Sequence, residues 1–243
     1  MSETINVLCM KWGTKYGPEY VNKLYGMVTR NLQRPFRFVC LTDNNDGIHE
    51  GVDCLPLPEL DLPPGAPERG WNKLTTFINP LFDLEGKVLF LDLDVVIVGS
   101  LDSFFDLEDG VHICRDFVRR DGTGNSSVYL YRANAHPDII ANFRENFASI
   151  QKQHRNEQEY LSHFLLAQGK LHYWPQTWCR SFKYDCLPGG VLGSWFNEAR
   201  IPDDARVLIF HGNPNPDDAV RGVSGKWYRR VKPTRWIEDY WRE

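Results

Sequence analysis

The stretch Lys87-Val88-Leu89-Phe90-Leu91-Asp92-Leu93-Asp94 is an apolar run that ends in two aspartates one residue apart. Its apolar, β-prone residues predict a buried strand over Lys87–Leu91. Side chains two residues apart on a strand point to the same side, so we expect Asp92 and Asp94 to converge. Neighbouring carboxylates repel each other unless a cation lies between them, and oxygen ligands suit a hard divalent metal. The simpler alternative is a strand that ends in an acidic turn, because short motifs often match by chance.

A βαβ unit precedes this stretch. Ile5–Met10 is an apolar run typical of a buried strand, and apolar residues at helical spacing follow over residues 20–32. Phe36–Leu41 is a second strand candidate that ends in the turn signal Thr42-Asp43-Asn44. Such a unit predicts a parallel sheet whose ligands bind at the carboxyl ends of its strands. It carries no GxGxxG sequence, which argues against the usual dinucleotide fold.

Alternating strands and helices continue to the last third of the chain, so we predict one α/β domain. Further predicted strands cover Val111–Cys114, Ser127–Tyr131 and Val207–Phe210, and predicted helices cover Trp71–Phe82, Pro137–Phe147 and Asn156–Ala167. Five prolines fall within residues 56–67 and predict a stiff loop, a kind of segment that is often functional.

Composition narrows the class of protein. The chain has 243 residues, 42% of them hydrophobic and 25% charged, and a formal net charge of −4. These values are typical of a globular protein with a sizeable core and exclude disorder, collagen and coiled coil. The small negative charge argues against a nucleic-acid binder. The six cysteines form no CxxC pair, and the start lacks a basic leader with an apolar core, so we expect a reduced, cytoplasmic protein.

The charge is unevenly distributed, which divides the chain into a body over residues 1–220 and a tail over residues 221–243. Seven basic and three acidic residues fall in the tail, where they alternate with the aromatic residues Trp227, Tyr228, Trp236, Tyr240 and Trp241. One interpretation is a peripheral contact with anionic lipid at the inner face of the membrane, or with a lipid-linked acceptor. The other is a closing helix docked on the domain, with Thr234 as its N-cap.

A histidine follows the last predicted strand. His211-Gly212 comes directly after Val207–Phe210, and the rigid turn Asn213-Pro214-Asn215-Pro216 follows. If this strand lies in the same sheet as Lys87–Leu91, the imidazole completes an Asp-Asp-His site that suits Mn²⁺ better than Ca²⁺. Taken alone, His211 would better fit a core histidine with its hydrogen bonds satisfied. A metal at this site could neutralise a diphosphate leaving group, a chemistry that indicates nucleotide-sugar transfer.

These blocks resemble those of the GT-A glycosyltransferases of the family 8 type, which includes glycogenin-like and bacterial lipopolysaccharide sugar transferases. The resemblance covers residues 5–216. Phe90-Leu91-Asp92-Leu93-Asp94-Val95-Val96 is similar to the metal-binding block of that family, and His211–Pro216 resembles its late His-Gly block, whose histidine is the third metal ligand. This resemblance implies a Rossmann-like, mixed and mainly parallel sheet flanked by helices. Gly212 and Asn215 fall in the substrate-binding block, although Asn215 stands where the family has lysine.

The same resemblance implies further site residues. Asn125 is similar to an asparagine that touches the donor sugar, although Ser127 replaces the usual glycine near it. Gln158, within Glu157-Gln158-Glu159, takes the place of a glutamine near the anomeric carbon, and Glu157 is the fallback candidate for a covalent nucleophile. The remaining implied contacts are Asp116 with the sugar, Lys73 with the sugar and phosphates, Tyr16 with the base, and Thr42 and Asp43 with the ribose.

Together these residues imply a retaining transferase. Mn²⁺ or Mg²⁺ on Asp92, Asp94 and His211 would hold a nucleotide-diphosphate sugar, most simply a UDP-sugar. Gln158 would stabilise the oxocarbenium-like state. The acceptor would be a glycan or a lipid-linked sugar, as in the synthesis of cell-envelope polysaccharide.

Two alternatives remain open. In a haloacid-dehalogenase-type phosphatase, Asp92 would be the nucleophile and Asp94 the general acid. That motif normally opens the chain, whereas here a βαβ unit precedes it, and we find no late Gly-Asp…Asp pair. The second alternative is a domain of the same fold that binds a nucleotide or glycan without turning it over.

Overall fold

The computed structural model describes residues 4–63, 65–66, 70–188, 193, 196–224 and 231–243. Its centre is a seven-stranded sheet in the order β3-β2-β1-β4-β7-β6-β8. The strands are β1 (Ile5–Lys11), β2 (Arg37–Thr42), β3 (Asp53–Pro56), β4 (Lys87–Leu91), β6 (Val111–Arg115), β7 (Gly124–Arg132) and β8 (Leu171–Tyr173). Only β7 runs against its neighbours β4 and β6, and the other pairs are parallel. The predicted mixed, mainly parallel sheet is therefore confirmed.

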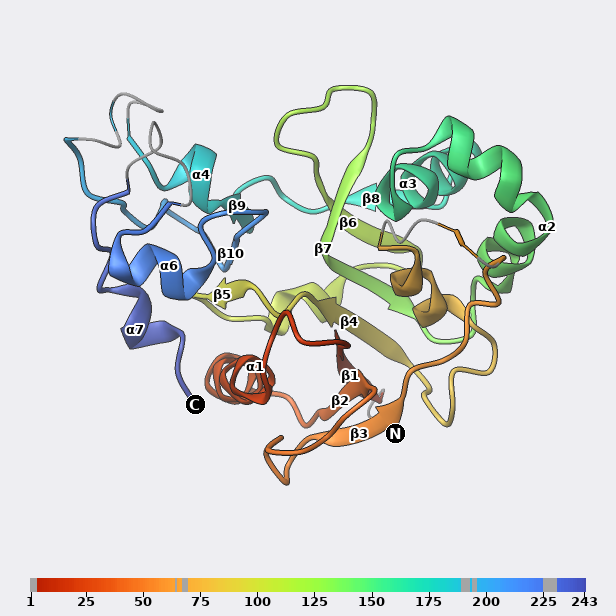
Figure 1. Cartoon of the computed structure of the whole chain (residues 1–243), viewed down its shortest axis with the longest axis horizontal. Coiled ribbons are helices and arrows are strands. Elements are labelled where there is room, and N and C mark those ends of the chain that lie inside the picture. Colours follow the sequence, from red (N-terminus) through yellow and green to blue (C-terminus); the bar gives the residue numbers. More distant parts are fainter. Residues whose placement is uncertain (1–3, 64, 67–69, 189–192, 194–195, 225–230) are drawn as a thin grey trace.

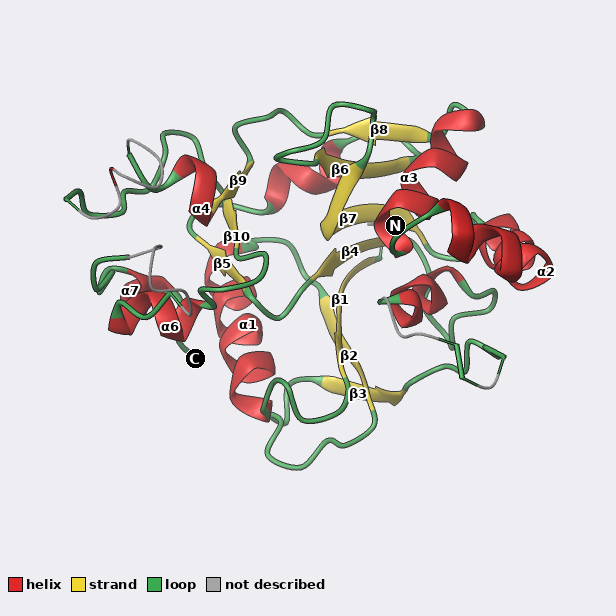
Figure 2. Ribbon diagram, turned by 45° about the horizontal axis from the view of Figure 1, so that its top comes forward, coloured by secondary structure: helices red, strands yellow, loops and turns green. Residues whose placement is uncertain are grey.

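Helices cover both faces of this sheet, with α1 on one side and α2 and α3 on the other (Figures 1 and 2). The helices are α1 (Pro18–Asn31), η1 (Trp71–Phe77), η2 (Asp102–Asp106), α2 (Pro137–Gln153), α3 (Glu157–Ala167), α4 (Phe182–Asp185), α6 (Pro216–Arg221) and α7 (Ile237–Tyr240). Leu89 and Leu91 of β4 pack into the core under α1, whereas Val88 and Phe90 pack into the core under α2 and α3. A strand buried on both faces explains why the central run is continuously apolar.

A second, three-stranded sheet lies beside the first. It contains β5 (Val95–Ile97), β10 (Val207–Ile209) and β9 (Cys179–Ser181), in the order β5-β10-β9. The condition set for the Asp-Asp-His site, that Val207–Phe210 lies in the same sheet as Lys87–Leu91, is not met, because the antiparallel partner of β10 is β5. The two sheets are nevertheless adjacent in sequence, since only Asp92–Asp94 separates β4 from β5.

Two predicted helices differ from those observed. The predicted helix Trp71–Phe82 is a 3₁₀ helix that ends at Phe77. Proline at position 80 disfavours helical geometry in the residue before it and cannot donate a backbone hydrogen bond, which accounts for the early end. The helix predicted over Pro137–Phe147 continues to Gln153. The other predicted strands and helices are confirmed to within a few residues, and the strands that the sequence missed are short.

The described part of the tail, residues 231–243, packs against α1. The Arg30 guanidinium donates to the backbone oxygens of Tyr240 and Arg242 over 2.8 and 2.7 Å. The Trp241 ring lies 5.1 Å from that of Tyr20. The prediction of Thr234 as N-cap is wrong, because α7 begins at Ile237.

Two of the aromatic residues on which the predicted membrane contact of the tail depends, Trp227 and Tyr228, lie outside the described residues. Within the described ranges, no helix combines the length and the apolar character that crossing a bilayer would require.

Candidate active site

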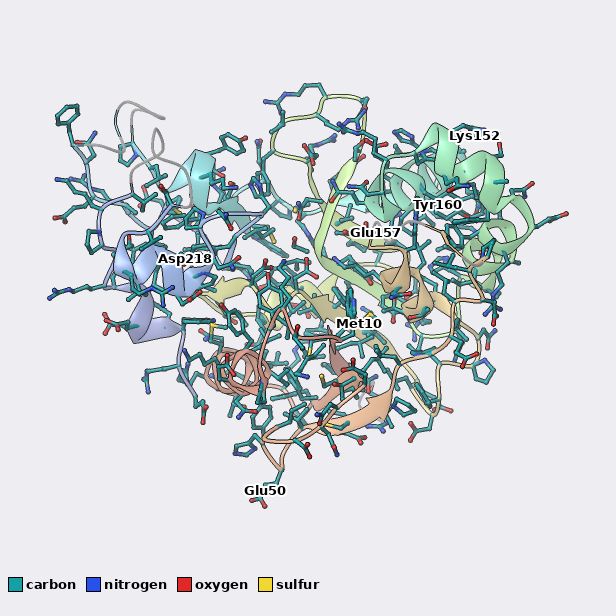
Figure 3. The ribbon with its side chains drawn as sticks, viewed as in Figure 1. Met10, Glu50, Lys152, Glu157, Tyr160 and Asp218 are labelled. Carbon is teal, nitrogen blue, oxygen red and sulfur yellow. The ribbon has the colours of Figure 1, made fainter. Side chains whose placement is uncertain are left out.

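A cleft of about 510 Å³ opens at the carboxyl ends of β1 and β4. This is the edge at which ligands of parallel α/β sheets bind. Its walls come from the loop that follows β1, from η1, from the turn after β4 and from the start of α3. The lining residues used below are Met10, Lys15, Tyr16, Gly70, Lys73, Asp92, Asp94 and Glu157. Figure 3 shows two of them, Met10 and Glu157, near the middle of the molecule.

Lys73 and Asp92 form the central ion pair of this cleft. The Lys73 Nζ atom lies 2.8 Å from Asp92 Oδ1 and also donates to the backbone oxygen of Ser126 over 3.3 Å. Burial alone would lower the pKa of Lys73, but the charges of Asp92 and Glu157 outweigh it and raise that pKa above its usual value. A permanent positive charge therefore stands in the cleft at neutral pH.

Glu157 closes the cleft on the side of α3. It is the first residue of that helix, after the N-cap residue Asn156, and its Oε1 atom accepts a 2.6 Å hydrogen bond from Ser126 Oγ. Lys73 Nζ lies 3.8 Å from the same oxygen. Burial raises the pKa of Glu157, and Lys73 and Ser126 partly offset the rise. Gly70 has a φ of 75°, and a Cβ there would lie 2.8 Å from Glu157 Oε2, so glycine leaves room for the carboxylate.

Asp94 faces the loop that follows β1. Its Oδ2 atom accepts a 2.7 Å hydrogen bond from the Tyr16 hydroxyl. Burial and the charge of Asp92 raise the pKa of Asp94 to about 6, although the bond from Tyr16 acts in the opposite direction. The expectation that strand geometry aligns the two aspartates is wrong, because β4 ends at Leu91 and both lie in the following turn. They still line one cleft.

His211 lies close to this turn through the backbone. The Phe210 amide donates to the Asp94 carbonyl over 3.3 Å, extending the β5–β10 pairing by one residue. The His211 ring stacks on Phe117, at 5.4 Å and 8°, and its Nε2 atom lies 2.7 Å from Ser181 Oγ. Burial and the charge of Lys183 lower the pKa of His211 to about 4, so the imidazole is neutral at pH 7.

The three predicted metal ligands thus come from neighbouring elements, but their side chains point to different partners. Throughout the part of the chain that the structure describes, no three His, Cys, Asp or Glu side chains form a group that could hold a metal ion. Gly212, the next residue after His211, has a left-handed φ of 68°, which glycine adopts without strain.

Asp116 and Gln158 contact each other beside the cleft. Asp116 Oδ1 accepts backbone hydrogen bonds from Val118 and Arg119, both of 2.8 Å, and its Oδ2 accepts from Gln158 Nε2 over 3.3 Å. The lining of the cleft includes Glu157 and not Gln158. Between the two residues predicted to lie near the anomeric carbon, the structure therefore places Glu157 nearer the cleft.

The other predicted substrate contacts have partners within the protein. Asn125 accepts from the Ser127 amide over 3.1 Å, and Thr42 Oγ1 donates to the Asn44 oxygen over 2.8 Å. Asp43 accepts from the Gly13 amide over 2.8 Å, which ties the loop after β2 to the loop after β1. Asn215 is the N-cap residue of α6 and its amide donates to Asp218 Oδ2 over 3.3 Å. None of these predicted contacts belongs to the described lining of the cleft.

Sequence reasoning missed part of the cleft wall. Lys15, Trp12 and Met10 line it, and so does Gly70. A signal for the first three was present, because Met10 is the last residue of the first predicted strand and the segment Lys11-Trp12-Gly13-Thr14-Lys15-Tyr16 directly follows it, at the ligand edge of the sheet. Nothing in the sequence indicated that Gly70 approaches Glu157.

Comparison with known proteins finds solved structures of similar architecture. The sequence matches no family model and no curated protein. Two solved structures of the galactosyltransferase LgtC are similar to it: an active-site mutant with 15% identity and a TM-score of 0.63, and a complex with donor and acceptor sugar analogues with 16% identity and a TM-score of 0.61. The alignments cover 87% of this chain and 89% and 88% of those chains.

The apo form of the glycosyltransferase GlyE from Streptococcus pneumoniae TIGR4 is also similar, at 14% identity and a TM-score of 0.60. That alignment covers 88% of this chain and 56% of GlyE, so GlyE is much the longer protein. These likenesses show that the chain has the fold of the LgtC structures, the GT-A fold.

Proposed function

We propose that this protein is a metal-dependent, retaining glycosyltransferase that moves a sugar from a nucleotide-diphosphate sugar to a glycan or lipid-linked acceptor. The observation that carries the proposal is the cleft at the carboxyl ends of β1 and β4, in which Lys73, Asp92, Asp94 and Glu157 meet. A positive charge beside two aspartates suits a diphosphate that is held through a cation. The likeness of the fold to sugar transferases favours this chemistry over that of a phosphatase.

The donor groups of three residues suit a divalent metal in their chemistry, although the described structure does not gather their side chains around one point. Asp92 and Asp94 supply hard oxygen ligands. Burial and the charge of Asp92 both raise the pKa of the half-buried Asp94, and a cation would relieve the repulsion between the two carboxylates. His211 is neutral at pH 7, which is the form of imidazole that binds metals. We assign Mn²⁺ or Mg²⁺ to Asp92 and Asp94, with His211 as third ligand. When bound, the ion supplies positive charge to the leaving diphosphate.

The chain's own residues bind and orient the donor. Lys73 offers its ammonium to the phosphates and sugar, and the Tyr16 hydroxyl holds Asp94 in place while its ring faces the base. Asp116 and Asn125 hydrogen-bond the sugar, and Thr42 and Asp43 contact the ribose from the next loop. Gly212 and Asn215 approach the diphosphate from the segment after β10.

Glu157 and Gln158 act at the anomeric carbon. Gln158 stabilises the oxocarbenium-like state, and the acceptor attacks on the face that the leaving group vacates, which retains the configuration. Glu157 lines the cleft with its carboxylate between Lys73 and Ser126, so it is the residue available for a covalent intermediate.

The test is a panel of nucleotide sugars, with UDP-sugars first, incubated with and without Mn²⁺ while NMR follows sugar release. Asp94→Asn, which keeps the shape and loses the charge, should reduce release at least about 100-fold, since a catalytic metal contributes several kcal/mol. The matched control is Asp46→Asn at an exposed position. Full activity in Asp94→Asn would contradict the metal assignment.

The same assays separate the alternatives. Turnover of p-nitrophenyl phosphate with Mg²⁺ would support the phosphatase. A rise in Tm with UDP but no release of any sugar would support a binding domain. We further propose a cytoplasmic location, with peripheral contact of residues 221–243 at the membrane. Salt-sensitive flotation with anionic liposomes, lost on truncation at Arg221, tests that contact.

A further inference from the structure

A second cavity, of about 270 Å³, lies between the carboxyl end of β6 and the segment formed by β9 and α4. The residues used below that line it are Arg115, Asp116, Phe117, Arg120, Trp174, Arg180, Tyr184 and Asp185. Its volume is just below the range of about 300–1,000 Å³ for pockets that bind drug-sized ligands, which suits one sugar residue with a substituent. We call it the arginine pocket.

Two buried hydrogen-bond donors in the arginine pocket are unpartnered. Within the described parts of the chain, neither Arg180 Nε nor Trp174 Nε1 has an acceptor, and both atoms are buried. The Trp174 residue is only 5% exposed. Leaving a buried donor unpaired is unfavourable. Both atoms are closed to solvent in this structure, so the anion-binding capacity of the pocket rests on its exposed guanidinium groups and not on these two donors.

Positive charge is also in excess there. Arg115 and Arg120 are exposed, and no described carboxylate forms an ion pair with either of them. The Arg115 guanidinium instead lies 3.8 Å from the centre of the Tyr173 ring, which leaves its outer edge free to donate. Arginine in this state is suited to phosphate and carboxylate groups, which it can bind through two parallel hydrogen bonds.

The acidic residues of the pocket are already engaged. Asp185 accepts from the Ser181 amide over 2.7 Å and lies 3.2 Å from Arg180 Nη2. Asp116 accepts from two backbone amides and from Gln158. Neither carboxylate therefore cancels the charge of Arg115 and Arg120.

The arginine pocket adjoins the proposed reaction centre. Asp116 links it to Gln158, and Phe117, which lines it, stacks on His211. The proposed donor cleft shares no lining residue with it. Tyr184 also lines the arginine pocket and is 54% exposed. Together with Phe117 it offers an aromatic face of the kind that packs against sugar rings.

We infer that the arginine pocket binds an anionic sugar, in which a phosphate or carboxylate group is bound by Arg115, Arg120 and Arg180. This inference rests on the proposed function: the sugar is part of the acceptor, so the acceptor glycan is acidic and not neutral. A sugar phosphate and a sugar carboxylate both carry anionic oxygens on a sugar ring, and the test below distinguishes these two groups.

The test uses the full chain and ligand-detected NMR with three probes: glucose 6-phosphate, glucuronic acid and the neutral methyl glucoside. At low salt, at least one charged probe should bind ten or more times more tightly than methyl glucoside. Arg115→Ala and Arg120→Ala should each weaken that binding about tenfold, which corresponds to ~1.4 kcal/mol. Arg235→Ala, an exposed arginine outside the pocket, is the matched control and should leave it unchanged.

UDP binding measured on the same proteins separates the two proposals. If UDP binds and the charged probes bind no better than methyl glucoside, the inference fails while the proposed function stands. If the charged probes bind through the arginines but no nucleotide binds, the pocket stands and the transferase proposal fails. Equal weakening in Arg235→Ala would overturn the inference, because it would show a general effect of charge. The stronger of the two charged probes identifies phosphate or carboxylate as the group recognised.

Discussion

Replacing Lys73 by methionine should destabilise the protein because Lys73 is the cation that separates the acidic residues of the cleft. Its Nζ atom lies 2.8 Å from Asp92 and 3.8 Å from Glu157, and its side chain is 12% exposed. At 3.8 Å and an effective dielectric constant of about 20, the Coulomb attraction between two unit charges is about 4 kcal/mol. Removing one partner of a buried pair typically costs about 3–5 kcal/mol. Because the Asp92 side chain is 25% exposed, we expect a loss of about 3 kcal/mol at pH 7.

Urea denaturation of metal-free protein measures this loss as a change in the free energy of unfolding. Lys152→Met, at an exposed position on α2, is the matched control and should change that free energy by less than about 0.5 kcal/mol. Glu157→Gln removes one of the carboxylates while keeping the side chain's size. In the double variant, at least about 1 kcal/mol of the Lys73→Met loss should be recovered, since neighbouring residues are not additive.

Equal stability of the Lys73→Met and Lys152→Met proteins would refute the reasoning, because the cleft would then need no cation of its own. A large loss with no recovery in the double variant would show that packing of the lysine stem, and not its charge, stabilises the cleft.

Three further changes test neighbouring contacts. Tyr16→Ala should weaken UDP binding about tenfold by calorimetry and Tyr16→Phe much less, since a ring stacked on a base is worth ~1–3 kcal/mol; equal losses would assign the effect to the hydroxyl. Trp241→Ala should cost about 3 kcal/mol and lower the Tm by roughly 6–12 °C, because its ring is 6% exposed against α1; an unchanged Tm would mean that the tail does not dock in solution. Glu159→Gln should cost about 2 kcal/mol in urea denaturation, because its buried carboxylate pairs with Arg119 and Arg155; a loss below about 0.5 kcal/mol would contradict this.

Much of the fold was predictable because its signals are local. The run Lys87–Leu91 is apolar at every position but the first, which only a strand buried on both faces requires. Asn156 before Glu157 is a typical helix start, and its side chain accepts from the Glu159 amide as a cap does. Residues whose role depends on one turn of helix or one strand could therefore be placed from the sequence.

What escaped prediction depends on contacts between distant segments. The neighbours of His211 come from Ser181 and Phe117, which are separated from it by many residues and belong to different elements. Periodicity reports which face of an element is buried, not which partner covers it. For the same reason, no pattern in the sequence indicated that Gly70 lies against Glu157 or that Arg180 lines a second pocket.

The turn Asp92–Asp94 shows why the site lies where the two sheets meet. It joins β4 of the large sheet to β5 of the small one, and the Asp94 carbonyl accepts from Phe210, next to His211. Any shift of the small sheet against the large one would therefore move His211 and Asp94 together while Asp92 stays with Lys73. Binding of one cation by His211 and both aspartates would need side chains to move, since Tyr16 now contacts Asp94 and Ser181 contacts His211, while the β5–β10 hydrogen bonds could stay. Spectroscopic titration with Mn²⁺ should therefore perturb the His211 ring without loss of the β5–β10 hydrogen bonds, which hydrogen exchange reports.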